Sequence, residues 1–460
     1  MRRREFLQAA AASTALTAAR SWGNALPGPP RPNFLLIIAD DMGWADVACY
    51  GRDDVNTPAV DSLARDGLKF QQAYANSSVC TPSRVALMTG RYQNRLRIGQ
   101  EEPLGAAAVG LEPSEPTLSS QLRAAGYQTS LVGKWHLGSL DRYSPLKHGF
   151  QHFWGIRGGG VDYFSHALSV RPDAQPDLWD GDTRLNEIGY VTDLIGQHGA
   201  AEITRMAAST DPFLLSVNFT APHWPWEGPH DEAVSKGLTD IMHHDGGTIA
   251  TYRAMIESLD ANVAKVLAAL RASGKEHDTL VAFTSDNGGE RFAKMWPFNG
   301  IKGELLEGGI RVPLLVRWPA LVRAGTVTQQ TAMTMDFLPT FLAAAGRTPD
   351  PSRPPDGMSL LPTLRDPAHV EERRLFWRYR AHDQAAARRG RYKYLRIEGT
   401  EYLFDVEADP QERGNLNKRQ AAIFEGLKAD WAAWNAEMLP YPSDSATWSN
   451  KSPRVLPDRY

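Results

Sequence analysis

Runs of consecutive apolar residues along the chain predict the buried strands of a mainly parallel β-sheet. Strands with both faces covered lack the alternation of polar and apolar residues seen in half-exposed strands. Four such runs occur, at 33–39, 128–133, 213–219 and 279–285. Segments of helical period lie between them; in 252–270 the apolar residues recur every three or four positions. This alternation of strands and helices is typical of an α/β fold.

Further helices, and a change of pattern near the C-terminus, complete the predicted architecture. Helices are expected at 57–68, 81–90, 117–125 and 336–345. A proline-rich stretch at 349–362 marks a boundary. Beyond it, the predicted elements are strands at 375–379, 392–397 and 402–404 and a helix at 419–437. We therefore predict a large, mostly parallel mixed sheet sandwiched by helices in 32–365, followed by a smaller antiparallel sheet with a packed helix in 366–460.

The first residues differ from the rest of the chain. Arg2, Arg3 and Arg4 precede an Ala-, Ser- and Thr-rich run that is too short and too weakly apolar to span a bilayer. The arrangement resembles a twin-arginine export signal, with cleavage expected near residue 26. A basic tail is the alternative. The export reading predicts a periplasmic or secreted protein without a membrane span.

Composition narrows the possible functions. The chain has 460 residues, of which 42% are hydrophobic and 22% charged, as in ordinary globular proteins. A formal net charge of −3 gives no reason to expect a nucleic-acid partner. The two cysteines, Cys49 and Cys80, do not make a disulfide framework, although they could pair with each other.

Polar residues follow each predicted strand, and ligands of open α/β sheets bind at that edge. Asp40 and Asp41 follow the first strand, and Asp286 and Asn287 follow the fourth. Their oxygen atoms suit Ca²⁺ or Mg²⁺ better than zinc. Taken singly, each pair could instead cap a helix or form a turn. Together, they predict a metal site at the edge of the sheet.

The stretch 77–90 carries the strongest candidate for chemistry. Thr81 is expected to cap a helix that has Pro82 in its first turn and ends at Gly90. Cys80 would then lie beside a helix N-terminus, which favours an anion, and Arg84 could lean toward it. The residues alone indicate an activated thiolate or an anion pocket. A buried apolar cysteine is the alternative.

Several motifs together resemble the sulfatase family. They are Cys80-Thr81-Pro82-Ser83-Arg84, Lys134-Trp135-His136-Leu137-Gly138, Pro222-His223 and Gly300-Ile301-Lys302-Gly303. The resemblance implies that a maturation enzyme oxidises Cys80 to formylglycine, whose hydrate is the nucleophile. It also implies that a divalent cation, usually calcium, binds Asp40, Asp41, Asp286 and Asn287 and touches residue 80.

The resemblance implies roles for the remaining residues as well. Arg84, Lys134 and Lys302 would hold the sulfate, His223 would protonate the leaving oxygen, and His136 would take a proton from the hydrate. Sulfate-ester hydrolysis needs these parts, because the nonbridging oxygens are anionic and an alkoxide leaves poorly. The predicted function is that of a sulfuric-ester hydrolase acting on a sulfated carbohydrate or an aryl sulfate.

Two other functions are compatible with the same residues. One is phosphodiester or phosphonate monoester hydrolysis, which other members of the superfamily that includes the sulfatases carry out. This function is disfavoured because the sequence offers ligands for only one metal. The other is a catalytically silent protein that binds sulfated sugars, disfavoured by the two histidines suited to proton transfer. Tryptophans in the predicted loops could stack on sugar rings or simply pack. They are Trp154, Trp179, Trp224, Trp226 and Trp296.

Overall fold

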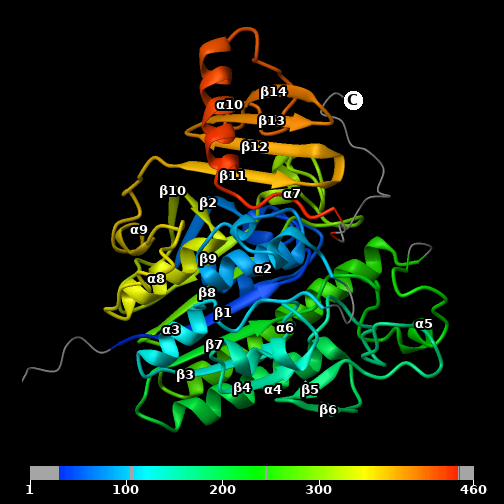
Figure 1. Ribbon diagram of the computed structural model, residues 1–460. Coiled ribbons are helices and arrows are strands. Elements are labelled where there is room, and N and C mark those ends of the chain that lie inside the picture. The colour runs from blue at the N-terminus through cyan, green and yellow to red at the C-terminus, as the bar shows by residue number, and fades with distance from the viewer. Residues whose placement is uncertain (1–30, 104–107, 244–245, 444, 446–460) are drawn as a thin grey trace, which may run out of the picture. The chain divides into compact units, whose positions relative to one another are not determined.

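The computed structural model describes residues 31–103, 108–243, 246–443 and 445 (Figure 1). The chain divides into two units, and the second begins at Pro32 and holds all the secondary structure described below. The predicted export signal, 1–26, lies outside the described residues. Within them, no helix combines the length and the apolar character that crossing a bilayer requires.

A large mixed sheet of ten strands forms the centre of the described chain. Its strands are β1 (Asn33–Ala39), β2 (Leu68–Tyr74), β3 (Gln128–Gly133), β4 (His152–Gly155), β5 (Leu178–Asp180), β6 (Thr183–Leu185), β7 (Phe213–Asn218), β8 (Thr279–Ser285), β9 (Leu314–Arg317) and β10 (Thr326–Met333). Their order is β10-β2-β9-β8-β1-β7-β3-β4-β5-β6. The strands β8, β1, β7 and β3 run parallel, so their carboxyl ends share one edge.

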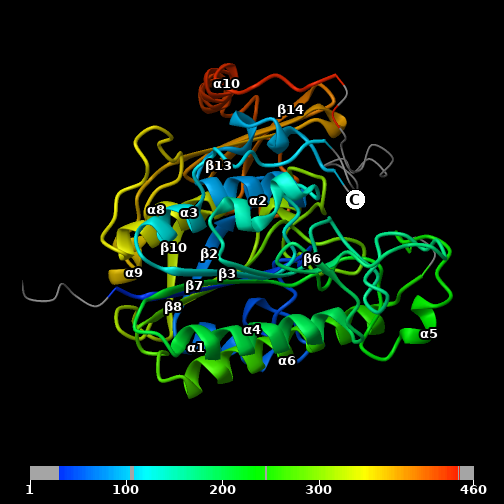
Figure 2. The ribbon, with the colours of Figure 1, turned by 60° about the horizontal axis from the view of Figure 1, so that its bottom comes forward.

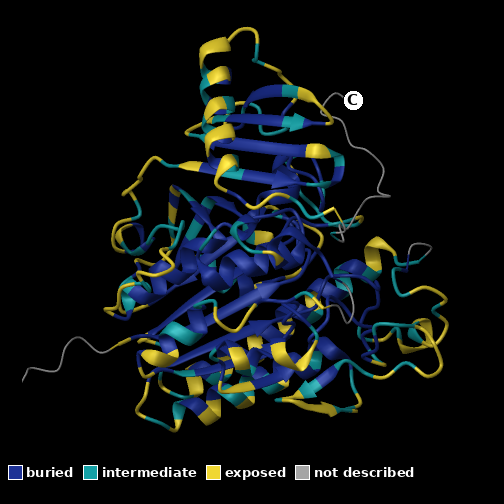
Figure 3. Ribbon diagram, in the orientation of Figure 1, coloured by how far each residue is buried: buried dark blue, intermediate teal, exposed yellow. Residues whose placement is uncertain are grey.

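Helices cover both faces of this sheet (Figure 2). One layer contains α1 (Pro58–Arg65), α4 (Val191–Ala207) and α6 (Ile249–Ala272), and the other contains α2 (Cys80–Thr89), α3 (Leu118–Ala124) and α8 (Phe337–Ala344). Because side chains alternate along a strand, β1 contributes residues to the hydrophobic core on each face of the sheet. Leu35 and Ile37 pack with the first layer, whereas Phe34 and Leu36 pack with the second. The central strands are buried, whereas the edge strand β6 and the outer helix surfaces are exposed (Figure 3).

A second sheet follows near the C-terminus. It consists of four antiparallel strands in sequence order, β11 (Arg374–Tyr379), β12 (Gln384–Arg389), β13 (Tyr392–Ile397) and β14 (Thr400–Asp405). The helix α10 (Ala421–Ala436) packs on it. Shorter helices are α5 (Glu232–Ser235), α7 (Glu307–Ile310) and α9 (Leu361–Arg365). The predicted fold class is confirmed; the boundary between 365 and 366 stays a prediction.

Some predicted element boundaries were wrong. The helix expected to reach residue 68 ends at Arg65, because Leu68 begins β2. Gly67, between this helix and β2, packs closely against β9: a Cβ there would lie 2.4 Å from the Val316 carbonyl oxygen. Thr81 is not the cap of α2, which begins at Cys80 without a side-chain cap.

Candidate active site

The predicted site residues come together at the carboxyl edge of the large sheet. They are Asp40, Asp41, Cys80, Arg84, Lys134, His136, His223, Asp286, Asn287 and Lys302. Separate elements supply them: the ends of β1, β3, β7 and β8, the first turns of α2, and the loop after β8. None has more than 3% of its surface exposed, although most are charged or polar. Such burial requires mutual pairing.

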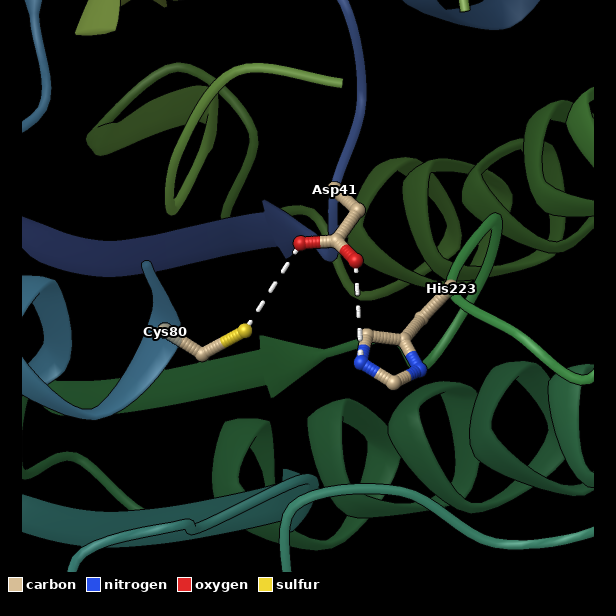
Figure 4. Close-up of side chains that lie close together, drawn as sticks. All are labelled: Asp41, Cys80 and His223. Atoms are coloured by element: carbon tan, nitrogen blue, oxygen red, sulfur yellow. Dashed lines mark hydrogen bonds and ion pairs between the residues drawn. The ribbon is translucent and has the colours of Figure 1, made fainter. Parts of the chain in front are cut away.

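Two aspartate carboxylates lie beside the Cys80 thiol. The thiol lies 3.4 Å from Asp40 Oδ1 and 3.7 Å from Asp41 Oδ1, to which it can donate (Figure 4). The Asp41 backbone N–H donates to Asp286 Oδ1 at 3.2 Å. Ligand atoms of these four residues all lie within 4.8 Å of one another. Residues from β1, α2 and the end of β8 thus form one acid cluster.

Three cationic side chains neutralise this cluster. Lys134 Nζ donates to Asp40 Oδ2 at 2.6 Å, and Lys302 Nζ donates to Asp41 Oδ2 at 2.6 Å. Arg84 Nε donates to Asp286 Oδ2 at 2.9 Å. Arg84 Nη2 also lies 3.4 Å from Asp40 Oδ1, so every carboxylate of the cluster has at least one cationic partner.

The donor set fits a hard divalent cation. Asn287 Nδ2 donates to Asp41 Oδ1 at 2.7 Å, while Asn287 Oδ1 is buried and has no hydrogen-bond partner among the described residues. A buried amide oxygen without a donor is costly, and a cation would satisfy it. With Asp40, Asp41 and Asp286 it makes a set of oxygen ligands of the kind that Ca²⁺ and Mg²⁺ prefer.

The pKa values follow from burial and these charges. Burial raises the pKa of Asp40 to about 8, against the opposing charge of Lys134. Burial acts the same way on Asp41, but Lys302 and His223 hold the pKa of that carboxyl well below its usual range. Burial also raises the pKa of the Cys80 thiol well above its ordinary value. This burial disfavours the thiolate, one of the two alternatives that the residues alone indicated, and favours the thiol form of the unmodified side chain.

Each of the two histidines lies close to residue 80 and has its own set of neighbours. His223 Nε2 lies 3.6 Å from Asp41 Oδ2, and Nδ1 donates to the Trp224 carbonyl at 2.6 Å (Figure 4). His136 Nε2 lies 2.9 Å from the Pro103 carbonyl oxygen. Burial lowers the pKa of both rings well below the ordinary histidine value, and nearby lysines add to the effect. Both imidazoles are therefore neutral at rest.

One residue of this neighbourhood was missed by the sequence reasoning. Glu102 is buried, and its carboxylate accepts the Thr81 N–H at 3.1 Å, one residue after Cys80. Burial raises the pKa of Glu102 to about 7, against Lys302 and Lys134. Glu102 belongs to none of the motifs and follows no predicted strand, so its place near Cys80 could not be predicted from the sequence.

The structure bears on two alternatives that the sequence left open. Cys49 and Cys80 are both free, so they do not pair. Most of the candidate tryptophans pack inside the protein, including Trp224 and Trp226. Trp296 differs, because 65% of its surface is exposed.

Comparisons with known proteins agree with the motifs. The sulfatase family matches residues 32–347, and the C-terminal region of N-sulphoglucosamine sulphohydrolase matches 302–433. Mouse (Mus musculus) steryl-sulfatase is 30% identical over 91% of this chain and 84% of its own. Human (Homo sapiens) N-acetylgalactosamine-6-sulfatase is 32% identical over 79% of this chain and 71% of its own. The crystal structure of Ps i-CgsB in complex with k-i-k-neocarrahexaose is similar, with a TM-score of 0.81 and 29% identity over 91% of this chain and 96% of that one.

Proposed function

The chain belongs to the sulfatase family and is a sulfuric-ester hydrolase, and from this premise we propose that it removes sulfate from a sulfated saccharide at residue 80. The observation that carries the proposal is the buried cluster around Cys80, in which three carboxylates and three cationic side chains meet. Such a cluster can hold a cation and a sulfate side by side. The relatives named above are sulfatases, which favours this reading over a phosphodiesterase or a silent sugar-binding protein.

We assign the metal site to Asp40, Asp41, Asp286 and Asn287, with residue 80 alongside. The cation is Ca²⁺, with Mg²⁺ as the alternative; when bound, it supplies positive charge to the sulfate oxygens and to residue 80. The unpartnered Asn287 oxygen supports this assignment. Arg84, Lys134 and Lys302 then bind the remaining sulfate oxygens, because their charged groups already lie in the cluster.

Residue 80 is proposed to act after a maturation enzyme has converted Cys80 to formylglycine. The hydrate of that aldehyde supplies the nucleophilic oxygen. The raised pKa of the unmodified thiol supports this, because a buried protonated thiol is a poor nucleophile. The formylglycine signature around Cys80 is the basis in the sequence.

Two histidines are proposed to move the protons. His223 presents Nε2 to the leaving oxygen, because its Nδ1–H is held by the Trp224 carbonyl. It donates from Nε2 in the imidazolium form, which the nearby charge of Asp41 favours. His136 accepts a proton from the hydrate at residue 80. A neutral imidazole can do this, and the burial that lowers its pKa keeps it neutral at rest.

The proposed substrate is a saccharide. One similar structure holds k-i-k-neocarrahexaose, and one relative is named for N-acetylgalactosamine 6-sulfate hydrolysis. The exposed ring of Trp296, on the loop that leads from Asn287 to Lys302, is suited to stack on a sugar. Steryl or aryl sulfates are the second candidates, since another relative is a steryl-sulfatase. We also propose export by the twin-arginine-type segment 1–26, which places the reaction in the periplasm or outside the cell.

The test compares Cys80→Ala with Cys49→Ala, the same change at the other cysteine. Both are produced with a formylglycine-generating enzyme, and peptide mass reports whether residue 80 has become an aldehyde. We expect sulfate release from saccharides and aryl sulfates by the wild type and Cys49→Ala, and none by Cys80→Ala. Chelation should abolish activity, and added Ca²⁺ or Mg²⁺ should restore it. Full turnover by Cys80→Ala, or by protein with an unmodified thiol, would refute the proposal.

A further inference from the structure

The Cys80 side chain has a second set of neighbours besides the acid cluster. Ligand atoms of Cys80, Glu102 and His136 all lie within 4.8 Å of one another. Glu102 exposes 5% of its surface and His136 exposes 1%. Residue 80 therefore lies close both to the acid cluster and to a buried carboxylate–imidazole pair. The roles described so far do not use that carboxylate.

The orientation of the His136 ring is set by its backbone neighbours. A carbonyl oxygen can only accept, so the 2.9 Å contact with the Pro103 carbonyl places the ring proton on Nε2. Nδ1 then carries a lone pair; it is buried and has no hydrogen-bond partner within the described segments. Gly159 leaves room for this arrangement, because a Cβ there would lie 2.4 Å from Nε2. The basic nitrogen of His136 is therefore Nδ1.

Glu102 connects this ring to the start of α2. Its Oε1 and Oε2 accept the Thr81 N–H at 3.3 and 3.1 Å, one of the N–H groups that a helix leaves unpaired in its first turn. The Thr81 hydroxyl donates to the His136 carbonyl at 3.2 Å. Glu102 Oε1 lies 3.9 Å from His136 Nδ1. One carboxylate thus touches the residue after Cys80 and faces the basic nitrogen.

We propose that Glu102 is a positioning residue of the reaction. Together with the Pro103 carbonyl, it holds His136 with Nδ1 turned toward residue 80 and pairs with the imidazolium when Nδ1 accepts a proton. In that step an O–H bond at residue 80 breaks, an Nδ1–H bond forms, and no electrons are exchanged with another group. Without Glu102, the imidazolium would face the charges of Lys134 and Arg84, which disfavour it. The inference rests on the proposed function, in which His136 is the proton acceptor.

The first experiment removes the charge of Glu102 and keeps the size of its side chain. Glu102→Gln keeps the size and one oxygen that can accept the Thr81 N–H. Glu101→Gln makes the same change at the neighbouring glutamate, which pairs with Arg97 at 2.6 Å instead. With an aryl sulfate at pH 8, we expect kcat of Glu102→Gln to fall by about 10²-fold, the size typical of a lost proton-transfer contribution, with KM unchanged. Glu101→Gln should keep the wild-type kcat.

The second experiment separates a charge effect from a structural one. Glu102→Ala leaves a space for a small carboxylate, so formate or acetate should restore kcat in a saturable way, whereas formamide and acetamide should not. ¹⁵N spectra of histidine-labelled protein, assigned with His136→Gln, should show the proton of the His136 ring on Nε2. This readout does not depend on turnover or on modification of Cys80.

The outcomes separate this inference from the function on which it rests. Wild-type kcat in Glu102→Gln, equal rescue by the amides, or a proton on Nδ1 would overturn the positioning role alone. A wild-type protein with formylglycine at residue 80 but without sulfatase activity would refute the proposed function. If Glu102→Ala does not fold, the kcat of Glu102→Gln and the ¹⁵N spectrum still test the positioning role of Glu102.

Discussion

Replacing Lys393 by methionine should strongly destabilise the protein, because this lysine is completely buried between two carboxylates. Lys393 Nζ lies 3.0 Å from Glu307 Oε1 and 2.9 Å from Glu412 Oε1, and none of the three side chains is exposed. Glu307 also accepts from Tyr74 Oη and from Arg311 Nη1, both at 2.7 Å. Methionine has a similar length but no charge, so Lys393→Met leaves buried carboxylates facing each other.

The size of the effect can be worked out from Glu307. Burial alone would raise the pKa of Glu307, but Lys393 and Arg311 lower it to about 2. Relative to the ordinary value of 4.5, this corresponds to about 3 kcal/mol of stabilisation of the charged form. Arg311 remains in the variant, but Glu412 loses the cation that faces it. We therefore expect a loss of about 3–5 kcal/mol in the free energy of unfolding, as for other broken buried ion pairs.

Thermal and urea unfolding at pH 7.5 would measure this loss. For a unit of about 430 residues, the unfolding entropy is about 0.9 kcal/mol/K, so Tm should fall by about 3–5 °C. Because the pKa of Glu307 is lowered in the folded state, its contribution is present above pH 4.5 and is lost as the pH falls toward 2. The difference between variant and wild type should therefore shrink in acid.

Lys428→Met is the matched control. Lys428 pairs with Glu401 at 2.7 Å, but 43% of its side chain is exposed. A pair of this kind contributes about 0–1 kcal/mol. If Lys393→Met were as stable as Lys428→Met, the buried cluster would not hold the structure together as argued.

Three further predictions concern other parts of the molecule. Burial raises the pKa of Asp260 to about 6, so the wild type should lose about 3 kcal/mol of unfolding free energy as the pH rises from 4 through 6. Asp260→Asn cannot ionise, so urea unfolding of this variant should not show that loss. Trp296→Ala should raise KM for a sulfated oligosaccharide by about three- to tenfold and leave KM for an aryl sulfate unchanged in steady-state assays, and equal changes would contradict stacking. Gly133→Ala should lower Tm far more than Gly390→Ala, because both have positive φ, but only at Gly133 would the new Cβ meet a backbone oxygen, at 1.9 Å.

The buried strands and the residues at their ends were predictable because they depend on local pattern. β3 and β8 have the predicted bounds, and Asp286 follows β8 as expected. β2 and β12 were not predicted. β2 alternates buried and half-buried residues around two glutamines, and β12 contains three alanines, which have low strand propensity. Both are held by neighbours that a local pattern does not show, since β2 pairs with β9 and β10 from much later in the chain.

The contacts that hold the loop carrying Lys302 could not be predicted from the sequence either, because they also join distant residues. The Gln384 side chain, at the start of β12, accepts the Leu305 N–H and donates to the Gly303 carbonyl, both at 2.8 Å. Glu412, beyond β14, accepts the Glu307 N–H at 2.6 Å. These contacts hold both sides of the turn that presents Lys302 to Asp41, although they join residues about 80 and 105 positions apart. The small C-terminal sheet is therefore part of the framework of the candidate site, because its contacts hold the loop that carries Lys302.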